Sequence, residues 1–225
     1  EAWVRPLGEH FQLHPLVIDD ILNTRQRPKL EEYDDYLFVI TRLLQYDPEY
    51  DYAMSSRQIS IVMFKNVVLT FQEQSSGTFR FVRERLRGAR RQIASLGADH
   101  LVYALLDGVV DSYFSILEKI TDYAEEIESK VLNQAEPALL RKVYRLKHEV
   151  QNLRRVLWPT RELMNGLQHL ESHLFDAETR LYLRDVYDHS VHLAEMIEMV
   201  RDSVTGTLDM YMSRQANRLN YEMRF

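Results

Sequence analysis

Two adjacent aspartates, Asp19 and Asp20, lie in the segment HPLVIDDILNTRQRP (residues 14–28) and raise the question of what a pair of carboxylates does there. Pro15 suits the first position of a helix, and His14 can cap that helix from just outside. The apolar residues recur at helical spacing and form one face, namely Val17, Ile18, Ile21 and Leu22. Both acids are therefore expected to point away from the core. The local pattern by itself favours a solvent-exposed pair, stabilised by the helix dipole by roughly 0.3–1 kcal/mol.

Other pairs of residues have metal-ligand spacing. Asp107 and Asp111 stand at i and i+4 and could share a cation or simply be exposed. His169 and His173 have the same spacing, but the metalloprotease pattern needs Glu directly after the first histidine, where this sequence has Leu170. The chain contains only seven glycines and shows no Gly-rich phosphate loop and no nucleophile elbow. No enzymatic activity is predicted.

Composition narrows the class of protein. With 225 residues, 45% of them hydrophobic, the chain can bury a substantial core. It has no cysteine, so disulfides and thiolate metal sites are excluded. The net charge of −6 argues against nucleic acid as the main partner. No uninterrupted apolar run approaches the ~18 residues that cross a bilayer, so we expect a soluble polypeptide.

Residues 1–98 are expected to form an α/β unit. Segments 36–46, 58–64 and 67–72 are rich in β-branched and aromatic residues and predict at least three strands, the last two joined by a tight turn at Lys65-Asn66. Residues 78–97 predict a helix closed by Gly97. Its six arginines are interpreted as a solvated basic face, because no base-stacking motif accompanies them.

Residues 99–171 are predicted to form an antiparallel helical hairpin, because apolar residues recur at steps of three or four on both sides of Pro137. Residues 172–225 then predict one long stalk helix, unbroken from about Ala177 to beyond Arg218 and roughly 70 Å long at 1.5 Å per residue. Its apolar seam has a seven-residue repeat, which is typical of a helix that pairs with other chains or leads into a membrane. Acids spaced every seven residues are expected to form an exposed stripe, which a symmetric oligomer would turn into carboxylate rings: Asp188, Glu195, Asp202 and Asp209.

The amino-acid sequences of several segments resemble those of the CorA family of magnesium transporters. The stretch HPLVIDDILNTRQRPKLEEYDDYLFVI is similar to an early segment of that family, in which an acid pair precedes Ile-Leu and Gln-Arg-Pro-Lys follows. Further segments follow in the family's order over nearly the whole chain, including VVLTFQE, VRERLR, DSYFSILEKI, LKHEVQNLRRVLWPTRE, YLRDVYDH, VRDSVTGTLDMYMS and NRLNYEM. The resemblance implies that a Gly-Met-Asn signature and two membrane spans would follow Phe225, and that further strands would precede Glu1.

This resemblance implies a fold and a function. The expected fold is a partial α/β sandwich, with the sheet flanked by helices, followed by the hairpin and the stalk, with the membrane spans absent. The expected function is the cytoplasmic, Mg²⁺-sensing domain of a homopentameric channel of the cell (inner) membrane. Bound Mg²⁺ at the subunit interfaces would favour the closed state. Mg²⁺ would be both regulatory ligand and cargo, with Co²⁺ or other divalent cations as further candidates, and this fragment alone could be monomeric.

The resemblance also answers the opening question. In similar proteins the second acid of the pair faces, across a subunit interface, the aspartate of the YLRDVYDH segment; these are Asp20 and Asp185 here. A second, more hydrated family site maps onto Asp19 and Asp107, although Asp19 stands where glutamate is common. Positions that line or narrow the pore entrance in the family match Asp209, Asn220 and Met223. Oxygen ligands of this kind suit a hard cation.

Two other interpretations remain open at this point. A zinc-transporting relative with the same architecture is kept open by His189 and His192, which follow closely after Asp185. A non-transporting coiled-coil adaptor that oligomerises through its stalk would show the same periodicity.

Overall fold

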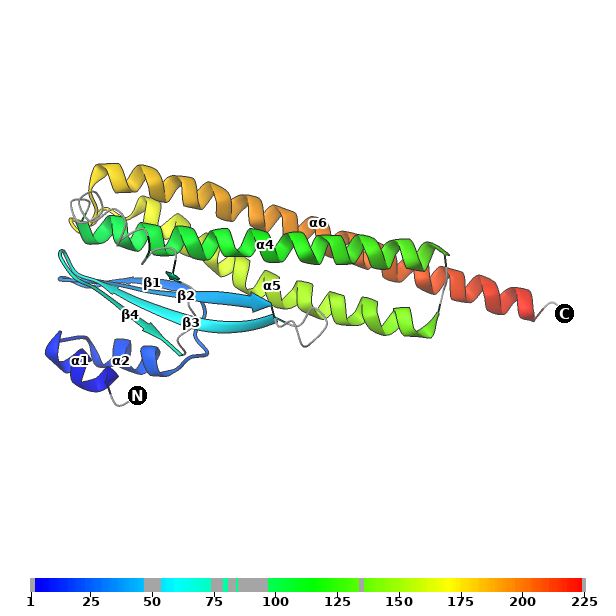
Figure 1. Ribbon diagram of the computed structural model, residues 1–225, viewed down its shortest axis with the longest axis horizontal. Coiled ribbons are helices and arrows are strands. Elements are labelled where there is room, and N and C mark those ends of the chain that lie inside the picture. The colour runs from blue at the N-terminus through cyan, green and yellow to red at the C-terminus, as the bar shows by residue number, and fades with distance from the viewer. Residues whose placement is uncertain are drawn as a thin grey trace.

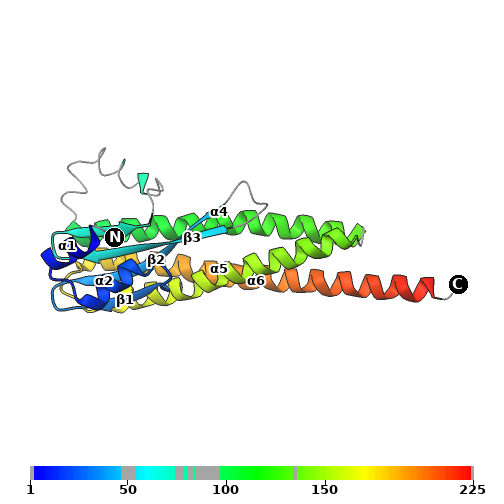
Figure 2. The same ribbon diagram turned by 90° about the horizontal axis from the view of Figure 1, so that it is seen from below.

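The computed structural model describes residues 3–46, 54–73, 79–80, 84, 97–133 and 136–223. Its core is a four-stranded sheet between two layers of helix (Figure 1). Two short helices cover one face, and three long helices lie along the other. The long helices run nearly parallel to the long axis, and the last one extends past the other two toward the C-terminus (Figures 1 and 2).

The short helices confirm the local sequence prediction. They are α1 (Val4–His10) and α2 (Pro15–Leu22). Pro15 opens α2, and the His14 Nδ1 atom accepts a hydrogen bond from the Leu16 N–H at 3.2 Å. The apolar face of α2 is buried against the sheet together with Phe38, Ile40 and Val62. Burial of this face fixes which side of α2 its acids can occupy.

The sheet is antiparallel throughout, in the order β1-β2-β3-β4. The strands are β1 (Lys29–Glu32), β2 (Leu37–Tyr46), β3 (Met54–Met63) and β4 (Val68–Gln72). The three predicted strands are confirmed, as is the tight turn, in which the Phe64 N–H donates to the Val67 carbonyl at 2.8 Å. The fourth strand, β1, was not predicted, because Lys-Leu-Glu-Glu carries no strand pattern.

Helices α4 (Gly97–Asn133) and α5 (Pro137–His169) form the predicted antiparallel pair (Figure 1). Gly97, expected to end a preceding helix, is the first residue of α4 and has φ +81°, a left-handed conformation that favours glycine. The helix predicted over 78–97 falls almost entirely outside the described residues.

Helix α4 is the element most relevant to the expectation about apolar length, although Asp107 and Asp111 interrupt its apolar sequence. Among the described residues it is the one helix long and apolar enough to cross a bilayer. Its apolar side chains are nevertheless packed in the protein interior, where Leu106, Val109 and Tyr113 are fully buried and contact the sheet cluster. Burial of this kind is typical of a core helix.

The stalk helix is α6 (Ala177–Glu222), so the predicted unbroken helix is confirmed. Its heptad seam is buried within this chain, against α4 and α5, and not left bare for partner chains as the sequence suggested. The seam residues are Leu183, Val186, Ser190, Leu193, Ile197, Val200, Val204 and Tyr211. The predicted acidic stripe is exposed along its whole length. A helix this long is stable here because its own hairpin covers it.

One apolar cluster joins β2, β3, α4, α5 and α6. The buried Asp99 carboxylate on α4 also accepts a hydrogen bond from the Asp176 N–H at the start of α6, at 3.0 Å. The division into an α/β unit, a hairpin and a stalk stays a prediction.

Candidate metal sites

Asp20 lies at the centre of a polar cluster that the sequence pattern did not reveal. Its side chain is only 19% exposed, not directed freely into solvent. The Lys29 Nζ atom lies 2.5 Å from its Oδ2 atom, and the Gln26 Nε2 atom donates to its Oδ1 atom at 2.6 Å. The side chains of Lys29 and Gln26 therefore already occupy the carboxylate that the family resemblance assigns to Mg²⁺.

Lys29 is held between two acids. Besides Asp20, it contacts the Glu31 Oε1 atom at 2.6 Å, and Tyr33 donates its hydroxyl to Glu31 at 3.0 Å. Partial burial by itself would lower the pKa of the Lys29 ammonium, but the hydrogen bonds to Asp20 and Glu31 outweigh it and raise the pKa. Lys29 therefore stays a cation at neutral pH.

Gln58 fixes the position of this cluster on the sheet. This buried side chain on β3 donates to the Asp20 carbonyl at 2.9 Å and accepts from the Gln26 N–H at 3.1 Å. The end of α2 and the following loop are thus tied to the same residue. The carboxylate of Asp20 is held by the tertiary structure as well as by its helix.

Asp19 differs from its neighbour and fits the local prediction. Its side chain is 64% exposed, and its closest described cation is Arg5 at 3.8 Å. An ion pair this open contributes little, typically 0–1 kcal/mol. Asp19 is therefore available to a ligand at the surface.

Asp185 is also open to solvent. It lies on α6 with its side chain 68% exposed, and the His189 Nε2 atom is 3.9 Å from its Oδ2 atom. Helix α6 lies on one side of the sheet, whereas α2, which carries Asp19 and Asp20, lies on the other (Figure 1). Within one chain, Asp20 and Asp185 cannot share an ion, and neither can Asp19 and a residue of α4.

A third candidate metal site combines residues of two long helices, α4 and α6. Asp107 and Asp111 on α4 and His189 on α6 each offer a ligand atom within 4.8 Å of the other two. Asp107 and His189 are half-buried, and Asp111 is exposed. The His189 Nδ1 atom is buried without a hydrogen-bond partner among the described residues. Asp107 thus lies with Asp111 and His189, and not with Asp19.

The predicted pore-entrance residues lie in the last part of α6. Asp209, Asn220 and Met223 are not buried by the rest of the chain, and Met223 is 78% exposed. Arg214 fastens this region to the hairpin by donating to the Val131 carbonyl at 2.6 Å and to the Leu132 carbonyl, at the last turn of α4. Most of the described residues of α6 beyond this contact are exposed.

The residues missed by sequence reasoning are Lys29 and Gln26. Both lie in the Gln-Arg-Pro-Lys run that was used only as a family signature. A basic residue soon after an acid pair is a weak signal, because the sequence does not show that the loop folds back onto α2.

Comparison with solved structures identifies the class of fold. The chain resembles the soluble domain of CorA from Methanocaldococcus jannaschii with a TM-score of 0.81 at 20% identity, covering 93% of this chain and 83% of that one. The ZntB cytoplasmic domain from Vibrio parahaemolyticus gives 0.79 at 16% identity, covering 95% and 84%. At these identities the likeness shows the fold: a sheet flanked by helices, with long helices beside it.

The family follows from the sequence match. The family described as CorA-like Mg²⁺ transporter protein matches residues 2–225, so this chain belongs to it. The Cobalt/magnesium transport protein CorA of Thermotoga maritima is 41% identical over 221 residues, covering 98% of this chain and 63% of that protein. The chain thus spans less than two thirds of that relative's length. The family is one of ion transporters, not enzymes.

Proposed function

We propose that this chain is the cytoplasmic regulatory region of a homopentameric, CorA-type magnesium channel of the cell membrane. Mg²⁺ bound between Asp20 of one subunit and Asp185 of the next would hold neighbouring subunits together and favour the closed pore. When cytoplasmic Mg²⁺ falls, the interfaces would loosen. Mg²⁺ is then regulator and cargo at once, and Co²⁺, which the name of the T. maritima relative includes, is a second candidate ion.

One observation carries this proposal: α2 and α6, the helices that carry Asp20 and Asp185, lie on opposite sides of the sheet (Figure 1). Such a placement suits a site that is completed only across subunits, in which Mg²⁺ keeps several waters and takes one or two carboxylates. Family membership supports transport over the adaptor interpretation. The burial of the stalk seam within the chain removes the main reason for assuming a coiled coil between chains.

Weak sites of this kind are sufficient when they are repeated. A site at ten times its Kd stabilises the bound state by about 1.4 kcal/mol, so five sites supply about 7 kcal/mol. Switching a population from 1:99 to 99:1 takes about 5.5 kcal/mol. Five interfaces therefore suffice where one does not.

The test uses the full-length channel. Patch-clamp currents of wild type and Asp185→Ala are recorded over rising cytoplasmic Mg²⁺, with Glu178→Ala as the control, because Glu178 is an exposed acid of the same helix outside the acidic stripe. Loss of one ligand at every interface should raise the Mg²⁺ concentration needed for closure only for Asp185→Ala. Inhibition at the same concentration in all three channels would refute Asp185 as a sensor.

A second candidate, a zinc-responsive relative, is favoured by the group of Asp107, Asp111 and His189. A mixed set of nitrogen and carboxylate ligands suits Zn²⁺ better than Mg²⁺. Isothermal titration of the chain with ZnCl₂ would show a His189→Gln-sensitive site if this group binds zinc. Zinc binding that His189→Gln leaves unchanged would exclude it.

A further inference from the structure

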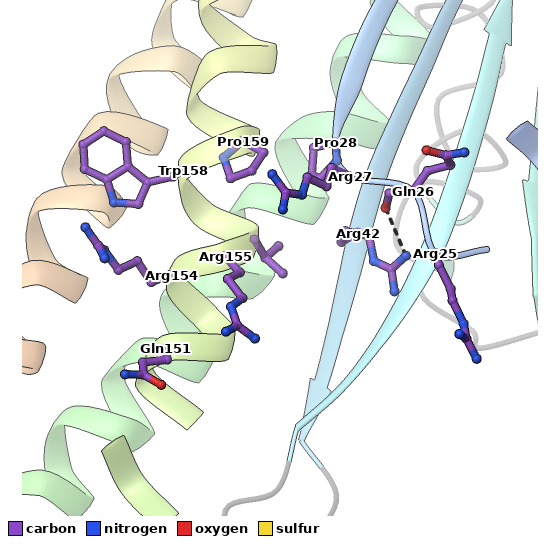
Figure 3. A pocket seen from close by; sticks show the side chains of 11 residues that line it. Arg25, Gln26, Arg27, Pro28, Arg42, Gln151, Arg154, Arg155, Trp158 and Pro159 are labelled. Atoms are coloured by element: carbon purple, nitrogen blue, oxygen red, sulfur yellow. Dashed lines mark hydrogen bonds between the residues drawn. The ribbon is translucent and has the colours of Figure 1, made fainter. Parts of the chain in front are cut away.

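A cavity of about 680 Å³ lies between α5 and the loop that leads into β1, away from the long-helix metal group (Figure 3). Five arginines line it: Arg25, Arg27, Arg42, Arg154 and Arg155. The part of its lining that the structure describes contains no Asp or Glu. The whole chain carries a net charge of −6. The cavity is therefore locally positive, whereas the chain as a whole is negatively charged.

Apart from Arg154, the arginines of this lining have no ion-pair partner among the described residues. Glu198 on α6 neutralises Arg154, which Figure 3 shows on the side of α5 away from the sheet. Arg25, Arg27 and Arg155 are exposed, and no described carboxylate lies within ion-pair distance of their side chains. Uncompensated like charges around one cavity repel each other, and an anion would remove that repulsion.

Arg42 is held in a fixed position in the cavity lining. Its Nη1 atom donates to the Thr24 carbonyl at 2.7 Å, and its Nη2 atom donates to the Ser56 carbonyl at 2.8 Å. These acceptors are neutral and hold the guanidinium in place, and the nearby Glu73 carboxylate attracts it without lining the cavity. Burial lowers the pKa of Arg42 from its usual value, but an arginine remains charged in proteins.

Two of the free guanidinium groups, those of Arg27 and Arg155, face the gap between the loop and α5, whereas the Arg25 side chain points away from α5 (Figure 3). In Figure 3, Arg27 projects from the loop toward α5, and Arg155 projects from α5 on the side that faces the sheet. Guanidinium forks bind phosphate oxygens in bidentate geometry, and arginine is the preferred residue for this recognition. A volume near 680 Å³ is typical of small-molecule sites.

We propose that this cavity binds a small anion that carries two or more phosphate groups. Arg27 and Arg155, together with the fixed guanidinium of Arg42 in the same lining, match the charge of a pyrophosphate or triphosphate better than that of a single phosphate. Neither Asp20 nor Asp185 lines this cavity, although Gln26, which does, also donates a hydrogen bond to the Asp20 carboxylate. Anion binding is tested in EDTA and therefore stands or fails independently of magnesium sensing.

The experiment is isothermal titration of the 225-residue chain in EDTA at constant ionic strength. The ligands are pyrophosphate, ATP, orthophosphate and citrate. Pyrophosphate and ATP should bind, with orthophosphate and citrate at least tenfold weaker. Equal affinity for ATP and pyrophosphate supports recognition of the polyphosphate alone, and tighter binding of ATP supports a nucleotide site. Citrate binding as tightly as pyrophosphate would overturn the phosphate assignment.

Variants of the exposed arginines locate the site. Arg27→Gln and Arg155→Gln should each weaken pyrophosphate binding about tenfold or more, since a hydrogen bond to a charged group is worth about 1.5–3 kcal/mol. Arg141→Gln is the matched control: it removes the same charge from an exposed position of α5 outside the cavity. Arg141→Gln should keep the Kd for pyrophosphate within twofold of the wild-type value. Equal weakening by all three variants would overturn the proposal, as would absence of binding in the wild type.

Discussion

The Lys29 ammonium lies 2.5 Å from the Asp20 carboxylate, in the place where the proposed regulatory Mg²⁺ would bind. We predict that Lys29 competes with Mg²⁺ for this carboxylate. In the full-length channel, Lys29→Met should lower the Mg²⁺ concentration for closure about two- to fivefold, the factor expected for an ion pair worth up to about 1 kcal/mol. Current recordings over a series of Mg²⁺ concentrations measure this shift.

The control is Lys65→Met, which removes the same charge in the exposed turn before β4. It should leave the closing concentration unchanged. If Lys29→Met instead requires more Mg²⁺ for closure, then Lys29 supports the clamp and does not compete with it.

Mg²⁺ binding should depend on assembly, because α2 and α6, which carry the two proposed ligands, lie on opposite sides of the sheet (Figure 1). Sedimentation velocity of the 225-residue chain should show oligomers that grow with added Mg²⁺. Asp185→Asn should abolish this growth, whereas Glu178→Gln, at another exposed acid of α6 outside the acidic stripe, should not. A tight Mg²⁺ site in protein shown to be monomeric would count against an interface clamp.

The stalk seam should determine the stability of the fold. Ile197 on α6 is fully buried, so Ile197→Ala should lower the free energy of unfolding by about 2–5 kcal/mol. Met199, two residues away, is 63% exposed. Met199→Ala should therefore change the free energy of unfolding by less than about 0.5 kcal/mol. Urea denaturation measures both. If the seam packed against other chains instead, both variants would lower the free energy of unfolding of the monomer by similarly small amounts.

Glu198 should make stability depend on acid pH. Partial burial would raise the pKa of its carboxyl, but hydrogen bonds from Trp158 and Arg154 outweigh this and hold the pKa below its usual value. A lowered folded-state pKa contributes stability above the unfolded value of about 4.3, and this contribution is lost as pH falls through the folded pKa. Glu198→Gln should therefore cost roughly 1–3 kcal/mol at pH 7 and show less loss on acidification.

Urea denaturation at pH 7 and near pH 3 tests this dependence. Glu195→Gln, at an exposed position of the same helix, is the matched control and should follow the wild-type profile. A wild-type profile for Glu198→Gln would show that its contacts with Trp158 and Arg154 contribute nothing to folding.

The sequence by itself determined the long helices, three of the four strands and the family. Apolar spacing of three or four residues reveals helices such as Ala177–Glu222, because the buried face of a helix repeats every 3.6 residues whatever covers it. The same repeat could not show that α4 and α5 of the same chain, and not other chains, cover the seam. Periodicity records that a face is buried and not which partner buries it.

The tertiary structure decided what surrounds each acid. Asp19 and Asp20 are neighbours in the chain, yet one is exposed and the other is held by Lys29 and Gln26, because the loop after α2 folds back to form the unpredicted strand β1. Likewise, His189 meets Asp107 and Asp111 only because α6 packs on α4. Contacts between residues far apart in the chain depend on how elements pack, and a single sequence carries no periodic signal for them.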